Sequence, residues 1–214
     1  NFPAPIVLAL LLNELRANVF KRFVQSVAYL PHFLSTVVIS GMIVNFLAID
    51  GVLNRLVEWF GGRQLQFLIE PSWFRTIYTA SDIWQQVGWG TIIYLAALTG
   101  IDPQLYEAAR MDGANRWKQM LHVTLPSLFP VITILFLLTI GNFLSVGYEK
   151  ILLLYNGSTY ETADVIQTYV YRRGLLGSDL SFAAAVGVFQ SVVAYILVVG
   201  ANRFTKWLGG TSLW

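Results

Sequence analysis

The sequence predicts an all-α protein that crosses a membrane several times. Of its 214 residues, 56% are hydrophobic and only 12% are charged, whereas soluble domains usually have about 25% charged residues. Long apolar stretches recur along the chain, and a membrane-spanning helix needs about 20 such residues. Because lipid covers an apolar exterior, we expect a polytopic helical membrane protein that forms a single transmembrane domain over residues 1–214.

Composition argues against several other classes of protein. The chain has no cysteine, and its formal net charge of +2 is too small to indicate a nucleic-acid partner. Its two histidines, His32 and His122, are far apart in sequence, so we expect no metal site. Neither a Ser/His/Asp arrangement nor a Gly-x-x-x-x-Gly-Lys-Ser/Thr phosphate-binding motif occurs. We therefore expect no enzymatic activity and no cofactor in this chain.

Five stretches are expected to cross the membrane. The first, residues 2–15, is short and has no initiator Met, so we expect a truncated beginning. The second, residues 24–49, contains Pro31, which removes a backbone donor and should kink the helix. The others cover residues 77–99, 126–146 and 182–204.

The connections between these stretches divide into two sets. Those on the side of residues 100–124 carry eight of the fourteen Lys and Arg residues, so the positive-inside rule places that side in the cytoplasm. On the other side, apolar positions recur at helical spacing in residues 52–60 and predict an interfacial helix. The aromatic segment 155–171 is expected outside, as a docking place for a partner protein or as an interface belt. Glu149 and Lys150 could pair with each other or with another loop, and of these alternatives we favour a solvated interface for both.

Residues 102–126 form the most informative connection. Asp102 suits the N-cap of a first helix, Pro103 suits its first position, and Gly113 suits a left-handed end. A second helix is expected over residues 114–122, before Leu125-Pro126 opens the next span. Such a surface helix pair would suit the docking of a partner protein, or it would be an ordinary interfacial loop.

The spacing of this segment resembles the EAA loop of binding-protein-dependent ABC importers. The residues that carry the resemblance are Glu107-Ala108-Ala109, Gly113 and Val123-Thr124-Leu125-Pro126, with Val123 where the family usually has isoleucine. Further segments look like the oligosaccharide-uptake branch of these permeases: Asn13-Glu14-Leu15-Arg16, Tyr29-Leu30-Pro31-His32-Phe33, Val87-Gly88-Trp89-Gly90, Tyr160-Glu-Thr-Ala-Asp-Val-Ile166 and the final Gly-Thr-Ser-Leu-Trp214.

The resemblance implies a transport subunit of the bacterial cytoplasmic membrane, with six spans in the complete protein. The EAA loop would be a cytoplasmic coupling helix in which Glu107 faces an ATPase subunit and Gly113 supplies the turn. The implied partners are a second related permease, two ATPase subunits that bind ATP and Mg, an external sugar-binding protein, membrane lipid and an oligosaccharide. A homodimeric permease would be a variant of this assembly.

Polar residues inside the expected spans are candidates for the sugar path. Asp82, Gln85, Gln86 and Trp89 recur at three- and four-residue steps and share one helix face. Amides, a carboxylate and an indole suit sugar hydroxyls and ring faces, but the same groups could hold one helix to another. Asn142 is a further candidate, with the same two interpretations.

A stand-alone secondary transporter or channel is the alternative function. It would favour internal inverted repeats and charged groups near the membrane midplane. We find neither in the sequence.

Overall fold

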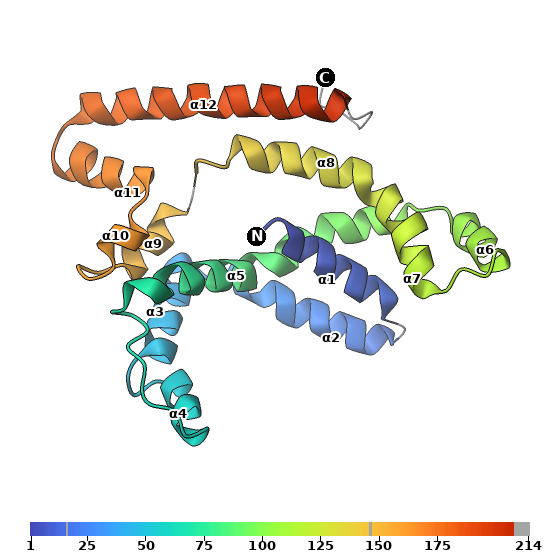
Figure 1. Cartoon of the computed structure of the whole chain (residues 1–214), viewed down its shortest axis with the longest axis horizontal. Helices are drawn as coiled ribbons and strands as arrows, with labels where there is room; N and C mark the ends of the chain where they lie inside the picture. The colour runs from blue at the N-terminus through green and yellow to red at the C-terminus, as the bar shows by residue number, and fades with distance from the viewer. Residues whose placement is uncertain (16, 146, 208–214) are drawn as a thin grey trace. The chain divides into compact units, whose positions relative to one another are not determined.

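The computed structural model describes residues 1–15, 17–145 and 147–207, and within them the chain forms helices and no strand (Figure 1). This confirms the predicted all-α fold. Arg16 and the final Gly-Thr-Ser-Leu-Trp segment, both used in the resemblance, lie outside these residues. Three helical segments of the described chain are long and apolar enough to cross a membrane: Thr36–Trp59, Arg116–Gly141 and Leu180–Trp207.

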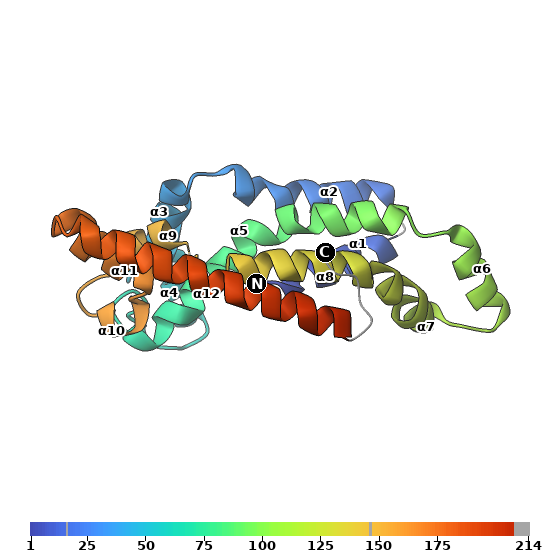
Figure 2. The ribbon, with the colours of Figure 1, turned by 90° about the horizontal axis from the view of Figure 1, so that it is seen from above.

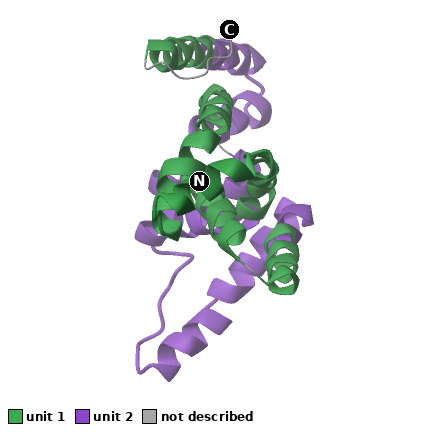
Figure 3. Ribbon diagram, turned by 90° about the vertical axis from the view of Figure 1, so that its right-hand side faces the viewer, with its two compact units in different colours: residues 1–29, 86–143, 192–214 green, residues 30–85, 144–191 purple. Residues whose placement is uncertain are grey.

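The chain divides into two compact units (Figure 3). Unit 1 consists of residues 1–29, 86–143 and 192–214, and unit 2 of residues 30–85 and 144–191. The helices α1 (Pro3–Glu14), α2 (Asn18–Tyr29), α6 (Pro103–Met111), α7 (Arg116–Gln119) and α8 (Leu125–Gly141) belong to unit 1. The helices α3 (Thr36–Leu47), α4 (Val52–Trp59), α9 (Tyr148–Leu154), α10 (Tyr160–Ala163) and α11 (Ile166–Val170) belong to unit 2. Two long helices, α5 (Pro71–Thr99) and α12 (Leu180–Trp207), contribute residues to both.

Unit 1 is built on the close packing of α1 and α2 against α5. A Cβ on Gly88 would lie 2.0 Å from the carbonyl oxygen of Ala28, so only glycine allows this approach. The Thr91 hydroxyl lies 3.3 Å from the carbonyl oxygen of Pro5 and donates to it. The core of this unit includes Tyr94, which is 2% exposed. The glycines of the Val87-Gly88-Trp89-Gly90 segment therefore have a packing function.

Unit 2 has its own core, formed around α3, α5 and α9, with Ile39, Phe74 and Ile151 buried. The predicted interfacial helix is α4, and its buried residue is the polar Asn54. The Asn54 amide donates to the carbonyls of Ala48 and Leu65, both at 3.0 Å. This amide therefore fixes the segments before and after α4.

The expected kinked helix over residues 24–49 is wrong, because the chain forms two helices there. α2 ends at Tyr29, a short 3-10 helix covers Leu30–Phe33, and α3 begins at Thr36. Pro31 lacks the backbone donor that would continue α2. The Ser35 hydroxyl then caps α3 by accepting from the Val38 amide at 3.3 Å. A new N-cap four residues after the proline makes a break more favourable than a kink.

Candidate functional site

The first helix of the expected coupling loop is α6, and its ends follow the prediction. The Asp102 carboxylate caps it by accepting from the Gln104 amide at 2.9 Å, and Pro103 is its first residue. Gly113 follows with φ of +74°, the left-handed conformation that glycine adopts at little cost. Figures 1 and 2 both show α6 at one end of unit 1, away from α1 and α2.

The second helix of the loop does not stop where the sequence suggested. Asn115 caps it through the Lys118 amide at 2.9 Å. From Arg116 the chain then runs through α7, a π-helical turn at Met120–Thr124 and α8, ending at Gly141. The expected break before Leu125-Pro126 is therefore wrong. Pro126 cannot donate to the carbonyl of residue 122, and the wider π turn at that point accommodates the missing bond.

The exposed surface of the loop combines one carboxylate with small and apolar residues. Glu107 and Ala108 are exposed on α6, whereas Ala109 is partly buried. Two large apolar side chains are strongly exposed: Met111 at 89% and Trp117 at 70%. Exposed apolar side chains of this size, on a loop that also carries an exposed charge, are typical of a protein–protein interface.

The last residues of the motif have an internal position. Thr124 is 1% exposed, and its hydroxyl lies 3.0 Å from the Tyr106 hydroxyl of α6. Val123 and Leu125 are partly buried, and Pro126 is exposed. The Val123–Pro126 part of the motif thus joins α6 to the helix that follows, while the Glu107 part provides the surface.

The four path candidates on α5 fall into two environments. In unit 2, Gln85 is 5% exposed and Asp82 is partly buried. In unit 1, Gln86 is exposed and Trp89 is 48% exposed. The first two are therefore largely covered by the chain itself, whereas the second two are not.

Asp82 is paired with a residue that the sequence placed elsewhere. Nζ of Lys150, on α9, lies 3.2 Å from Asp82 Oδ1, and the Lys150 side chain is only 4% exposed. The same Nζ is 6.0 Å from the centre of the Tyr78 ring. The expectation of a solvated Lys150 is wrong, because the carboxylate and the aromatic ring replace water around the ammonium group.

Asn142 lies at the end of a helix and not inside one. α8 stops at Gly141, five residues before the expected end at 146, and Asn142 is its exposed C-cap. The backbone N–H of Asn142 donates to the carbonyl of Thr139 at 3.1 Å, and the side-chain Nδ2 donates to the carbonyl of Leu138 at 3.5 Å. Its side chain is therefore accessible, but the polar residue costs little at this position.

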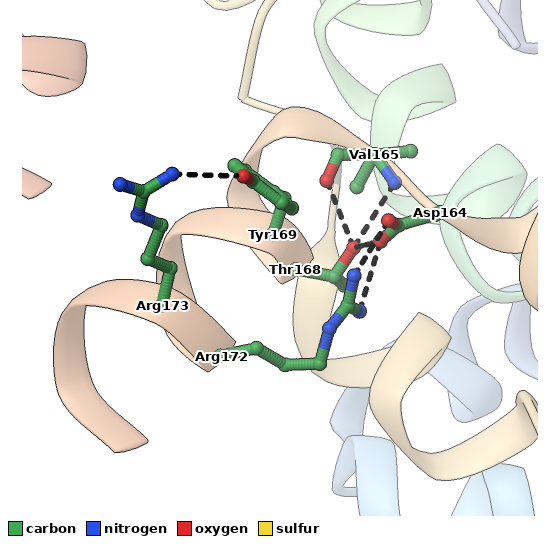
Figure 4. A network of polar contacts seen from close by, with 6 residues as sticks. All are labelled: Asp164, Val165, Thr168, Tyr169, Arg172 and Arg173. Carbon is green, nitrogen blue, oxygen red and sulfur yellow. Dashed lines mark hydrogen bonds and ion pairs between the residues drawn. The ribbon is translucent and has the colours of Figure 1, made fainter. Parts of the chain in front are cut away.

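The aromatic segment after α9 is helical and contains a charge network (Figure 4). Arg172 makes two bonds to Asp164, Nη2 to Oδ2 at 2.6 Å and Nη1 to Oδ1 at 3.0 Å. Thr168 donates to the same carboxylate. The hydrogen bonds from Arg172 hold the pKa of Asp164 below its ordinary value. This network fixes α11 to the turn that precedes it.

A match to a protein-family model identifies the class of protein to which this chain belongs. The family described as "Binding-protein-dependent transport system inner membrane component" matches residues 1–208. The chain belongs to this family. It is therefore a multi-pass membrane component of a transport system.

Relatives within the family are permease proteins of sugar transport systems. The chain is 48% identical over 214 residues to the polygalacturonan/rhamnogalacturonan transport system permease protein YteP of Bacillus subtilis, covering 100% of the chain and 67% of YteP. It is 46% identical over 206 residues to protein LplB of the same organism, covering 96% of the chain and 65% of LplB. The chain thus spans about two thirds of the length of these relatives.

A solved structure has the same fold. A chain of a bacterial alginate ABC transporter, in complex with an alginate pentasaccharide-bound periplasmic protein, superposes with a TM-score of 0.96 at 45% identity. The match covers 99% of this chain and 74% of that one. At this identity the likeness reflects common descent as well as a common fold.

Sequence reasoning missed two features of these sites. Met111 lies only two residues after Glu107-Ala108-Ala109, and it is even more exposed than Trp117. The Asp82–Lys150 pair was also missed, although an acidic residue within an expected span usually has a partner. The need of Asp82 for a partner was the feature of the sequence that could have indicated a basic residue such as Lys150.

Proposed function

We propose that this chain is the transmembrane permease subunit of an ATP-driven importer of oligosaccharides in a bacterial cytoplasmic membrane. It works beside a second related permease, two ATPase subunits and an external sugar-binding protein. ATP and Mg are bound by the ATPase subunits. The observation that carries the proposal is the exposed α6 surface, with Glu107 and Ala108 beside Met111, at the position of the family's coupling motif.

The proposed coupling is mechanical. α6 seats in a cleft of the ATPase, and closure of two ATPase subunits on ATP moves the coupling helices of the two permeases. The Tyr106–Thr124 hydroxyl contact at 3.0 Å links α6 to the π turn from which α8 continues. Motion of the docked helix therefore reaches a candidate membrane span within unit 1.

The names of the relatives support an oligosaccharide as the substrate. YteP is a polygalacturonan/rhamnogalacturonan permease, and the solved importer was crystallised with an alginate pentasaccharide on its periplasmic protein. The exposed Gln86 and Trp89 are the α5 residues that we propose to line the path. An indole face stacks on sugar C–H groups, and an amide bonds hydroxyls.

Glu107→Lys tests the docking surface. In the reconstituted importer this charge reversal should abolish sugar-stimulated ATP hydrolysis and uptake, while the permease remains in the membrane. Glu58→Lys is the matched control, because Glu58 is equally an exposed helical glutamate but lies on α4, outside the loop. Normal uptake by the Glu107 variant would refute the docking role.

A pull-down tests the assembly. The complete protein, purified in mild detergent, should retain an ATPase and a second permease, and Gly113→Pro should release the ATPase, because proline cannot adopt φ of +74°. Recovery of this chain alone, with solute uptake that needs no ATP, would favour the secondary transporter.

A further inference from the structure

A pocket in unit 2 with both apolar and polar lining residues lies apart from the residues discussed so far. It has a volume of ≈ 220 Å³. This is several times the roughly 30 Å³ that one water occupies in the liquid, and it is below the roughly 300–1,000 Å³ of pockets for drug-sized ligands. Its size therefore suits one sugar ring. The lining residues are Tyr148, Gln167, Val170, Tyr171, Leu175, Ala183, Gly187 and Gln190.

The elements around the pocket place its polar groups on facing helices. Gln167 and Tyr171 are one helical turn apart, and Gly187 and Gln190 lie three residues apart on α12. The two helices approach closely at Gly174, because glycine has no Cβ. A Cβ added there would lie only 2.6 Å from the Ala183 Cβ. At Gly187, by contrast, an added Cβ would meet nothing within 4 Å, so space remains beside it.

Two side-chain amides of this pocket have unused hydrogen-bonding atoms. Oε1 of Gln167 and Nε2 of Gln190 are both buried, and neither has a hydrogen-bond partner among the residues that the structure describes. One is an acceptor and the other a donor. Gln190 also lies within a candidate membrane span, where an unpaired amide is costly and usually faces a polar cavity or a ligand.

We propose that the Gln167 and Gln190 amides form a subsite for a hydroxyl-bearing ring of the transported saccharide. Sugar hydroxyls both donate and accept, so they can donate to Gln167 Oε1 and accept from Gln190 Nε2, while Tyr148 and Tyr171 supply aromatic rings to the lining for sugar C–H groups. The subsite rests on the proposed function, because it takes its ligand from the import pathway. It is distinct from the α5 candidates, which are not part of the lining.

The test replaces both glutamines by methionine, which keeps their length and removes the hydrogen-bonding atoms. The complete importer, wild type and Gln167→Met/Gln190→Met, is reconstituted in liposomes, and ATP-driven uptake of labelled oligogalacturonan and alginate pentasaccharide is measured. The variant should raise KM about tenfold or more, as expected for two lost hydrogen bonds. Gln66→Met is the control, because Gln66 is exposed in the same unit outside the pocket.

Thermal stability of the purified proteins without sugar is the second readout. Because the two atoms have no partner within the described chain, the methionine variant should melt no lower than wild type. A lower midpoint would show that bound water or a neighbouring subunit already satisfies the amides, and it would overturn the subsite. The subsite would also be overturned if the doubly substituted importer were as active as wild type and had an unchanged KM. A wild-type importer that takes up neither probe would instead refute the proposed function.

Discussion

Replacing Lys150 by methionine should destabilise unit 2 strongly, since it removes the buried cation that pairs with the Asp82 carboxylate. Breaking a buried pair by removing one partner costs about 3–5 kcal/mol. The Asp82 side chain keeps 23% exposure, and this access to water favours the lower end, about 3 kcal/mol. With about 2–4 °C per kcal/mol for chains of 150–250 residues, the midpoint should fall by about 6–12 °C.

The assay is a double-mutant cycle on the detergent-purified protein. Wild type, Lys150→Met, Asp82→Asn and the double variant are melted at low and high salt. The double variant should recover much of the loss, because both charges of the pair are then removed. The coupling should persist in high salt, since Lys150 is shielded from solvent. If the two single effects add within about 0.5 kcal/mol, the ion pair is not the stabilising contact and the argument fails.

Two further changes test the close packing of unit 1 and the network of Figure 4. Gly88→Ala should destabilise by about 1–3 kcal/mol, because its Cβ would lie 2.0 Å from the Ala28 oxygen, whereas Gly200→Ala meets open space and should not; equal thermal midpoints would contradict this. Asp164→Asn should lower the midpoint at neutral pH. Because Arg172 lowers the folded pKa of Asp164, this difference should persist down to the ordinary carboxyl pKa near ~4 and shrink as pH falls further. A difference that grows on acidification would refute it.

Much of the fold follows from local patterns in the sequence. Apolar stretches identify the helices, and the caps of α6 follow from Asp102, Pro103 and Gly113, whose side chains or backbone preferences act within a few residues. The break after Tyr29 was harder to predict. Pro31 favours either a kink or a stop, and the outcome depends on whether the chain can begin a new helix at Ser35.

The contacts that define the candidate sites are not local. Asp82 and Lys150 are 68 residues apart, and no periodicity connects them. The shared face of Asp82, Gln85, Gln86 and Trp89 was a sound inference about one helix. It did not show which part of that face is covered, because burial depends on the elements packed against α5 in each unit.

The continuity of α7 with α8 bears directly on how the proposed docking surface would act. A flexible joint at Leu125-Pro126 would absorb motion of the loop in a few backbone angles. The chain instead runs helically from Arg116 to Gly141, with the π turn at Met120–Thr124 taking up the effect of Pro126. A displacement of the docked loop is then carried along a continuous helical segment that is long and apolar enough to cross the membrane. We infer that the π turn preserves this continuity where a proline would otherwise break it.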